Sequence, residues 1–176
     1  AYTSYYLPPE RVVLHTNVIA MICRWRQDDA SNPAGRADAL AARHAWQAAL
    51  APGSLYTWDY YLAHNREPSP NRGRPVFFPR ARAEDLRSWS GALQGELIEC
   101  ATAGGCMTFP GLNQLNIFVT ARLYWDPGQD LDALLKAYYT RFYGPAAAPM
   151  RAFCEQAERT WMRLEAADIE ALQAAL

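Results

Sequence analysis

Carboxyl and aromatic side chains stand together where three stretches of apolar or β-branched sequence end. Asp59 lies in the segment WDYY, and Glu99 lies in the segment ELIEC. A carboxylate accepts hydrogen bonds and exchanges protons, whereas an indole or phenol ring offers an apolar face with a polar tip. Together these groups suit hydrogen bonding to hydroxyls and stacking against the apolar face of a ring. The residues concerned are Arg24, Trp25, Trp58, Asp59, Tyr60, Tyr61 and Glu99.

A structural interpretation competes with this one. The carboxylates of Asp59 and Glu99 can pair with an arginine such as Arg24, and the aromatic rings can pack beneath helices. Alternation along a strand also sends Trp58 and Tyr60 to one face and Asp59 to the other. Both sets reach one site only if the strand ends near Asp59, and we expect that it does.

The elements that position these residues follow from local sequence. The continuous apolar run NVIAMICRW is typical of a buried parallel strand. The predicted strands are Asn17–Trp25, Ser54–Tyr61 and Glu96–Cys100, and Ala1–Leu7 is expected to be the end of another. The predicted helices are Arg36–Leu50, Ala81–Leu93, Leu112–Trp125, Asp130–Tyr143 and Ala146–Leu176, the last as one long helix or two shorter ones. The predicted loops between these elements are Asp28–Gly35, Leu62–Pro79 and Ala101–Gly111.

Strands that alternate with helices predict right-handed crossovers and a parallel sheet. The connection lengths suit a (β/α) barrel or a doubly wound sheet, and no glycine-rich nucleotide-binding motif follows any strand. The expected fold class is α/β. Residues 1–111 would form the second half of a (β/α)8 TIM-type barrel with three or four parallel strands, and residues 112–176 a helical C-terminal extension packed on it. The edge strands of a half barrel are exposed, so we expect a preceding half or a second copy of the chain to complete it.

Composition narrows the function classes. The 17 basic and 18 acidic residues leave a net charge of -1, which gives no electrostatic case for nucleic acid or an anionic membrane. No apolar run is long enough to predict membrane insertion. The four cysteines and three histidines lack metal-site spacing, so we expect neither a metal nor another cofactor. Cys100 and Cys106 either bridge a loop or remain free thiols.

The C-terminal half carries a recognisable pattern. An alanine-containing helix ends in the turn Leu-x-Trp-Asp-Pro, an acidic stretch and a helix follow, and then a Tyr-Gly-Pro-Ala-Ala segment. These lie at Leu123–Pro127, Asp130–Asp132 and Phe142–Ala147, and Trp58–Tyr61, Glu99, Ala1-Tyr2 and Pro8-Pro9 also fit. The pattern resembles a domain of unknown function in bacterial glycoside-hydrolase-like proteins, some of whose relatives are endo-β-N-acetylglucosaminidases. The wider neighbourhood resembles β-N-acetylhexosaminidases and α-glucuronidases.

This resemblance implies a barrel that acts on glycans containing N-acetylglucosamine. The general acid and its neighbour would follow the fourth barrel strand, before Ala1, so this chain alone would be inactive. The pair Asp28-Asp29 follows a different strand and does not match. In a bacterium, the resemblance favours a secreted, periplasmic or cell-surface protein.

The same resemblance implies that this chain supplies a sugar-binding wall. The expected substrate-binding residues are Arg24, Trp58, Asp59, Tyr60, Glu99 and Asn113. Two of them have strong structural alternatives: Arg24 in an ion pair, and Asn113 as a helix cap. The alternative function is a non-catalytic carbohydrate-binding or scaffold module, and a third interpretation is a complete small α/β protein of unrelated function.

Overall fold

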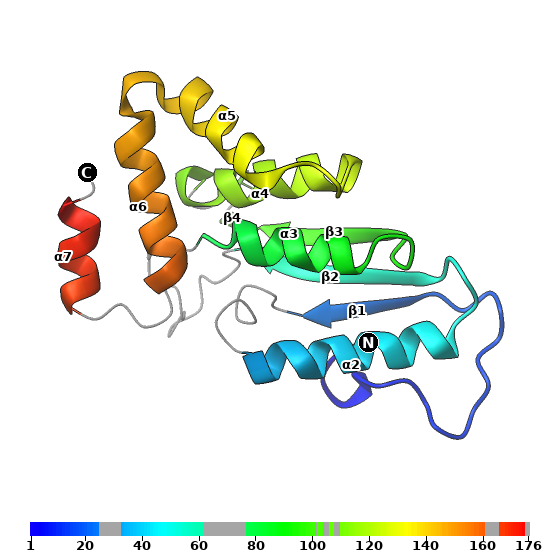
Figure 1. Cartoon of the computed structure of the whole chain (residues 1–176). Helices are drawn as coiled ribbons and strands as arrows, with labels where there is room; N and C mark the ends of the chain where they lie inside the picture. The colour runs from blue at the N-terminus through cyan, green and yellow to red at the C-terminus, as the bar shows by residue number, and fades with distance from the viewer. Residues whose placement is uncertain are drawn as a thin grey trace. The chain divides into compact units, whose positions relative to one another are not determined.

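The computed structural model describes residues 1–24, 33–61, 77–100, 102–103, 106–107, 110–160 and 166–174. The chain divides into two compact units, and Figure 1 labels their helices and strands. The first unit contains β1, α2, β2 and β3, and the second contains α3 to α7. The loop predicted over residues 101–111 holds the two-residue strands β4 (Thr102–Ala103) and β5 (Cys106–Met107), which pair with each other.

The sheet of the first unit is parallel, which confirms the expected α/β class. Strands β1 (Ala20–Arg24), β2 (Leu55–Tyr61) and β3 (Gly95–Cys100) lie in the order β1-β2-β3. Helix α2 (Pro33–Ala49) connects the first two. In this register Cys23 pairs with Trp58, and Tyr60 pairs with Glu99. Because the strands are parallel, their carboxyl ends lie at the same end of the sheet.

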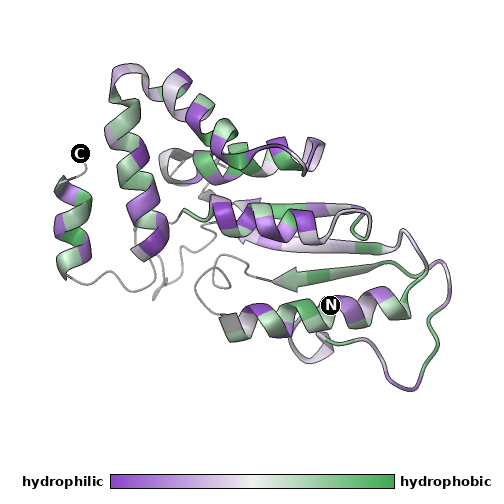
Figure 2. Cartoon of the chain, in the orientation of Figure 1, coloured by the Kyte–Doolittle hydropathy of each residue, from purple (hydrophilic) through white to green (hydrophobic). Residues whose placement is uncertain are grey.

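One face of this sheet is covered by α2. Buried Ala20, Ile22 and Leu55 of the sheet pack with Trp46 of α2 and with Trp89. The Trp46 indole donates a hydrogen bond to the carbonyl oxygen of Tyr6 (2.7 Å). Figure 2 shows the apolar character of β1 and the mixed character of α2, as expected for a helix with one face on a core.

The opposite face is more open. Along β2, Leu55, Thr57, Asp59 and Tyr61 are buried, whereas Tyr56, Trp58 and Tyr60 are only half-buried. Leu97 and Glu99 of β3 are exposed. The alternation predicted for a strand therefore separates a helix-covered face from a face lined by aromatic rings.

The N-terminal segment differs from the prediction. Thr3–Tyr5 forms the short 3-10 helix η1 rather than a strand, and Thr3 has a φ of 48°. Ala1 alone behaves like a strand residue: its amino group donates to the carbonyl oxygen of Met21, and the Cys23 N–H donates to its carbonyl oxygen (2.9 Å). This pair of bonds is the pattern of one bridge in a parallel ladder, on the edge of β1 opposite β2.

The second unit is helical. Its elements are α3 (Pro79–Ser88), α4 (Pro110–Trp125), α5 (Leu131–Tyr143), η2 (Gly144–Ala146), α6 (Ala147–Thr160) and α7 (Ala166–Ala174). Asp130 caps α5 by accepting from the N–H groups of Asp132 and Ala133. Gly144 ends α5 with a φ of 54°, a conformation that suits glycine. Within the described residues, the C-terminal segment predicted as one long helix or two shorter ones contains α6 and α7. Helix α3 ends at Ser88, earlier than predicted, and the ring of the next residue, Trp89, packs in the core of the first unit.

Arginines of α3 connect this helix to its neighbours in the second unit. Arg80 forms ion pairs with Asp132 of α5 (3.0 Å) and with Glu155 and Glu158 of α6 (3.7 and 3.9 Å). Arg82 is almost fully buried and donates to Tyr124 Oη (3.0 Å) and Asp85 Oδ2 (3.2 Å). A buried guanidinium needs such partners, because its charge cannot be neutralised by losing a proton.

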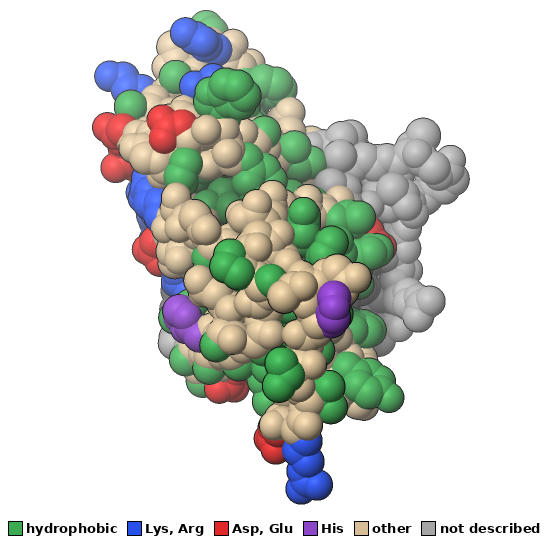
Figure 3. Space-filling model, turned by 90° about the vertical axis from the view of Figure 1, so that its right-hand side faces the viewer, with side chains coloured by type: hydrophobic (Ala, Val, Ile, Leu, Met, Phe, Trp, Pro, Cys, Tyr) green, Lys and Arg blue, Asp and Glu red, His purple; other side chains and the backbone are tan. Residues whose placement is uncertain are grey.

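Exposed apolar side chains are numerous on the face shown in Figure 3. The exposed large apolar residues of the N-terminal segment are Tyr2, Tyr5, Leu7, Val12, Val13 and Ile19. In the described part of the chain, no helix is both long and apolar enough to cross a membrane.

Candidate functional site

The open face of the sheet holds a small pocket of about 300 Å³. It lies beside β1 and β2, toward the ends where a parallel α/β sheet usually carries its ligand sites. Its lining residues are Ala1, Tyr2, Met21, Cys23, Trp58 and Tyr60. We call this the aromatic pocket.

Register and alternation explain why these residues meet. Cys23 is the direct partner of Trp58, and Met21 is the partner of Tyr56, so all four side chains belong to one face. Gly95 is the partner of Tyr56 on β3. A β-carbon at Gly95 would lie 3.2 Å from Tyr56 Cε1, so the glycine leaves room for that ring on the pocket face.

Tyr60 brings a hydroxyl group into the aromatic pocket. Cys23 Sγ donates a hydrogen bond to Tyr60 Oη (3.4 Å). The side-chain hydrogen bond with Cys23 and, second, burial raise the pKa of Tyr60. The phenol therefore stays protonated at neutral pH and keeps a proton to donate.

Trp58 supplies both a ring face and an N–H group. Its ring centroid lies 6.4 Å from that of Tyr60, with an interplanar angle of 40°. Its Nε1 atom is buried and has no hydrogen-bond partner in the part of the chain that the structure describes. A buried donor without a partner costs about 1–3 kcal/mol, so a ligand that accepts from this N–H would recover that energy.

Glu99 shares this face. It is the register partner of Tyr60, it is exposed, and its charge contributes to the raised pKa of Tyr60. Of the predicted substrate-binding residues, the structure thus brings together Trp58, Tyr60 and Glu99. The pocket has three aromatic lining residues, Tyr2, Trp58 and Tyr60, and the carboxylate of Glu99 lies on the same face outside the lining. Together these groups can bind a polar ring.

The expected position of Asp59 is wrong. Strand β2 does not end near Asp59 but continues to Tyr61, so alternation places Asp59 on the helix-covered face. Its side chain is fully buried there, and its Oδ1 atom accepts from the Tyr60 N–H (2.8 Å). Asp59 therefore does not line the aromatic pocket.

Two further predictions have different outcomes. Asn113 is not the cap of its helix, because α4 begins at Pro110 and Asn113 lies within its first turn, fully buried in the second unit. The backbone of Arg24 pairs with Asp59. The side chain of Arg24 and the whole of Trp25 lie outside the described residues, as does any pairing of Cys100 with Cys106.

Sequence reasoning missed Tyr2, Met21 and Cys23. The signal was present for two of them: once Asn17–Trp25 pairs in parallel with Ser54–Tyr61, alternation places Met21 and Cys23 on the face of Trp58. The position of Tyr2 depends on the bridge between Ala1 and β1, which no local pattern reveals. Among the described residues, no group of three or more metal-binding side chains occurs.

Comparison with known proteins gives one match. A family model described as "Domain of unknown function (DUF4838)" matches residues 1–155. No curated protein and no solved structure matches the chain.

Proposed function

The chain belongs to the DUF4838 family, a domain of unknown function, and we propose that it supplies the sugar-binding wall of a glycoside-hydrolase-like protein acting on glycans that contain N-acetylglucosamine. The observation that carries the proposal is the aromatic pocket, in which the indole N–H of Trp58, without a partner among the described residues, lies beside the protonated phenol of Tyr60. The sequence resemblance to glycoside-hydrolase-like proteins supplies the substrate class.

Each group has a role in this proposal. The Trp58 ring stacks on the C–H face of the sugar, and its Nε1–H donates to a sugar oxygen. The Tyr60 hydroxyl donates to the carbonyl oxygen of the acetamide group. Glu99, exposed on the same face, accepts hydrogen bonds from sugar hydroxyls, because an ionised carboxylate is a strong acceptor.

The pocket face offers the carboxylate of Glu99 but not that of Asp59, which is buried on the other face. Cleavage of a glycosidic bond generally uses two carboxyl groups, or one acid with the help of the substrate's own acetamide. We therefore propose that the general acid comes from outside this chain.

A larger barrel is part of the same proposal. The parallel bridge between Ala1 and β1 supports a further strand on that edge of the sheet, in line with β1, β2 and β3. Four such parallel strands make half of a (β/α)8 barrel, and the open aromatic face would then be its interior.

The alternative proposal is a non-catalytic carbohydrate-binding module. It is favoured by the single exposed carboxylate on the described part of the pocket face. The two proposals share the sugar site and differ in whether the whole protein turns substrate over.

Titration of the chain with N,N′-diacetylchitobiose tests the site. We expect saturable binding in isothermal titration calorimetry that falls at least about tenfold in Trp58→Ala, because both stacking and an N–H donor are lost. Trp125→Ala is the matched control, since Trp125 is an exposed tryptophan of the second unit. Unchanged binding in Trp58→Ala would refute the sugar site.

Turnover of a chromogenic N-acetylglucosaminide by the natural full-length protein separates the two proposals. The enzyme proposal expects activity that falls in Glu99→Gln. Sugar binding without turnover at any pH would instead establish the binding module.

A further inference from the structure

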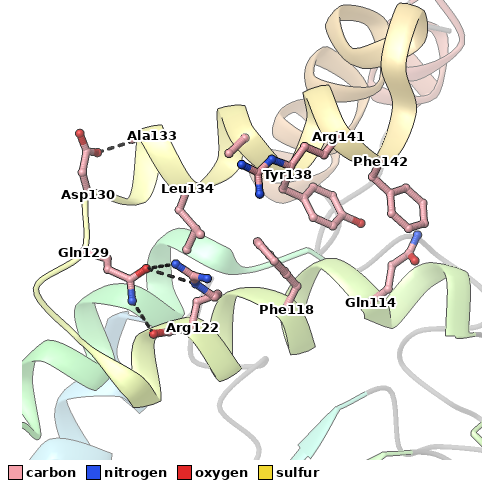
Figure 4. Close-up of a pocket in the computed structure, with 11 residues that line it drawn as sticks. Gln114, Phe118, Arg122, Gln129, Asp130, Ala133, Leu134, Tyr138, Arg141 and Phe142 are labelled. Atoms are coloured by element: carbon pink, nitrogen blue, oxygen red, sulfur yellow. Dashed lines mark hydrogen bonds between the residues drawn. The ribbon is translucent and has the colours of Figure 1, made fainter.

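A second hollow lies between α4 and α5, within the helical unit (Figure 4). It has a volume of about 640 Å³. We call it the helical groove. Its lining residues are Gln114, Phe118, Arg122, Gln129, Asp130, Ala133, Leu134, Ala137, Tyr138, Arg141 and Phe142.

The spacing of the lining residues follows the helix period. Gln114, Phe118 and Arg122 lie four residues apart along one side of α4. The α5 side repeats in the same way, from Leu134 through Tyr138 to Phe142. Two such parallel rows of side chains leave a furrow that accepts the ridge of a third helix.

The floor of the groove is apolar and aromatic. The ring centroids of Phe118 and Tyr138 lie 5.0 Å apart, and the rings of Tyr138 and Phe142 stack at 5.5 Å. In Figure 4, Phe118 and Leu134 point into the space between the two helices. Phe142 remains more than half exposed, so its ring still offers apolar area to a partner.

Each end of the groove carries an arginine, Arg122 at one end and Arg141 at the other. The guanidinium group of Arg122 is held by Gln129 Oε1 (3.2 and 2.9 Å), and no ion pair involves Arg141 in the described part of the chain. Asp130, the acidic residue of the lining, is engaged as the cap of α5. Carboxylates at the two ends of an incoming helix would complement both arginines.

A second copy of this chain does not fit the groove well. In the described residues, no α-helix exposes two large apolar side chains three or four positions apart, which such a ridge requires. We therefore propose that the helical groove binds an amphipathic helix of a partner protein, with an apolar ridge along one side and an acidic residue near each end.

The test uses a synthetic probe: a fluorescein-labelled, hydrocarbon-stapled helix of about fourteen residues, roughly four turns long. The probe carries leucines along one side and a glutamate near each end, and a second version has lysines in place of the glutamates. We expect saturable binding of the acidic probe to the chain by fluorescence anisotropy, and weaker binding of the basic probe.

Two variants of the chain decide the outcome. Ala137→Trp fills the groove and should abolish binding. Arg141→Glu should weaken the acidic probe about tenfold and strengthen the basic probe, a reversal that misfolding would not produce. Lys136→Glu is the matched control, because it makes the same charge change on an exposed residue of α5 outside the groove.

Three results would overturn the proposal. They are no binding of the acidic probe, binding that persists in Ala137→Trp, and equal effects of Arg141→Glu and Lys136→Glu. Self-association of the chain that Ala137→Trp abolishes would also overturn it, by assigning the groove to a second copy. Sugar binding by the aromatic pocket is unaffected by any of these results.

Discussion

The aromatic pocket and the helical groove are both lined by aromatic rings, yet they suit different ligands. In the pocket, strand alternation puts Trp58 and Tyr60 on one face of the sheet. The buried Trp58 N–H has no hydrogen-bond partner among the described residues, and the Tyr60 hydroxyl accepts from the Cys23 thiol (3.4 Å). In the groove, helix periodicity lines up Phe118, Leu134 and Phe142, which have no polar atoms. Aromatic content therefore does not define a ligand, because the element that presents the rings decides what they can bind.

The largest expected effect concerns the two faces of the sheet. Asp59→Ala should lower the free energy of unfolding by about 2–4 kcal/mol, because it removes a fully buried carboxyl group that accepts from the Tyr60 N–H. Glu99→Gln should change it by less than about 0.5 kcal/mol, because Glu99 is exposed. Urea denaturation followed by circular dichroism measures both. Similar losses in the two variants would mean that the sheet faces are not divided as described.

The contrast between Asp59 and Glu99 shows which parts of the fold can be predicted from the sequence. The apolar run before Arg24 and the β-branched run before Tyr61 predict their strands and the parallel sheet, because strand patterns are local. Whether a strand stops at Asp59 or at Tyr61 is not local: it depends on pairing with β3, which extends to Cys100. One such difference moved Asp59 from the expected site to the opposite face.

The residues of the candidate site can also be predicted in part. Trp58, Tyr60 and Glu99 share a face because side chains alternate regularly along a strand and parallel strands pair in regular register. Both regularities apply once the strands are predicted from the sequence. Tyr2 reaches the pocket through the bridge between Ala1 and β1, a contact between distant segments. The helical groove was not predicted, because the spacing of Leu134 and Tyr138 fits a buried face equally well.

The second prediction concerns the helical unit and its dependence on pH. Burial raises the pKa of Glu158 to about 7, against the opposing effects of the Arg80 N–H and guanidinium group. Because the folded-state pKa lies above the unfolded one, the stabilising contribution is full below pH 4.5 and is lost as the pH rises through about 7. The free energy of unfolding should therefore fall by about 1–3 kcal/mol between pH 5 and pH 8 on account of this group.

Glu158→Gln tests this dependence. The amide oxygen can still accept from the Arg80 N–H, so the variant should lose the pH-dependent part and be more stable than the wild type at pH 8. Urea denaturation at pH 5, 6.5 and 8 measures the difference. The control is Asp132→Asn, which removes an exposed carboxylate paired with the same arginine. An unchanged pH profile in Glu158→Gln would show that Glu158 is ionised throughout this range.

The smallest expected effect returns to the aromatic pocket and sharpens its contrast with the helical groove. Tyr60→Phe keeps the ring and removes the hydroxyl, so affinity for N,N′-diacetylchitobiose should fall about threefold, the loss of one net hydrogen bond. Tyr56→Phe is the matched control, because Tyr56 lies on the same face of the same strand but outside the pocket lining. Calorimetric titration of both variants compares them.

The direction of this last result distinguishes polar recognition from simple stacking. If the Tyr60 hydroxyl donates to the sugar, its removal should weaken binding of the acetamido sugar more than binding of a disaccharide without acetamide groups, such as cellobiose. If only the ring of Tyr60 contributes, Tyr60→Phe should leave the affinity for both sugars unchanged. Tyr60 would then contribute only apolar area, as Phe118 and Phe142 do in the groove, and the assignment of a donor role to its hydroxyl would be wrong.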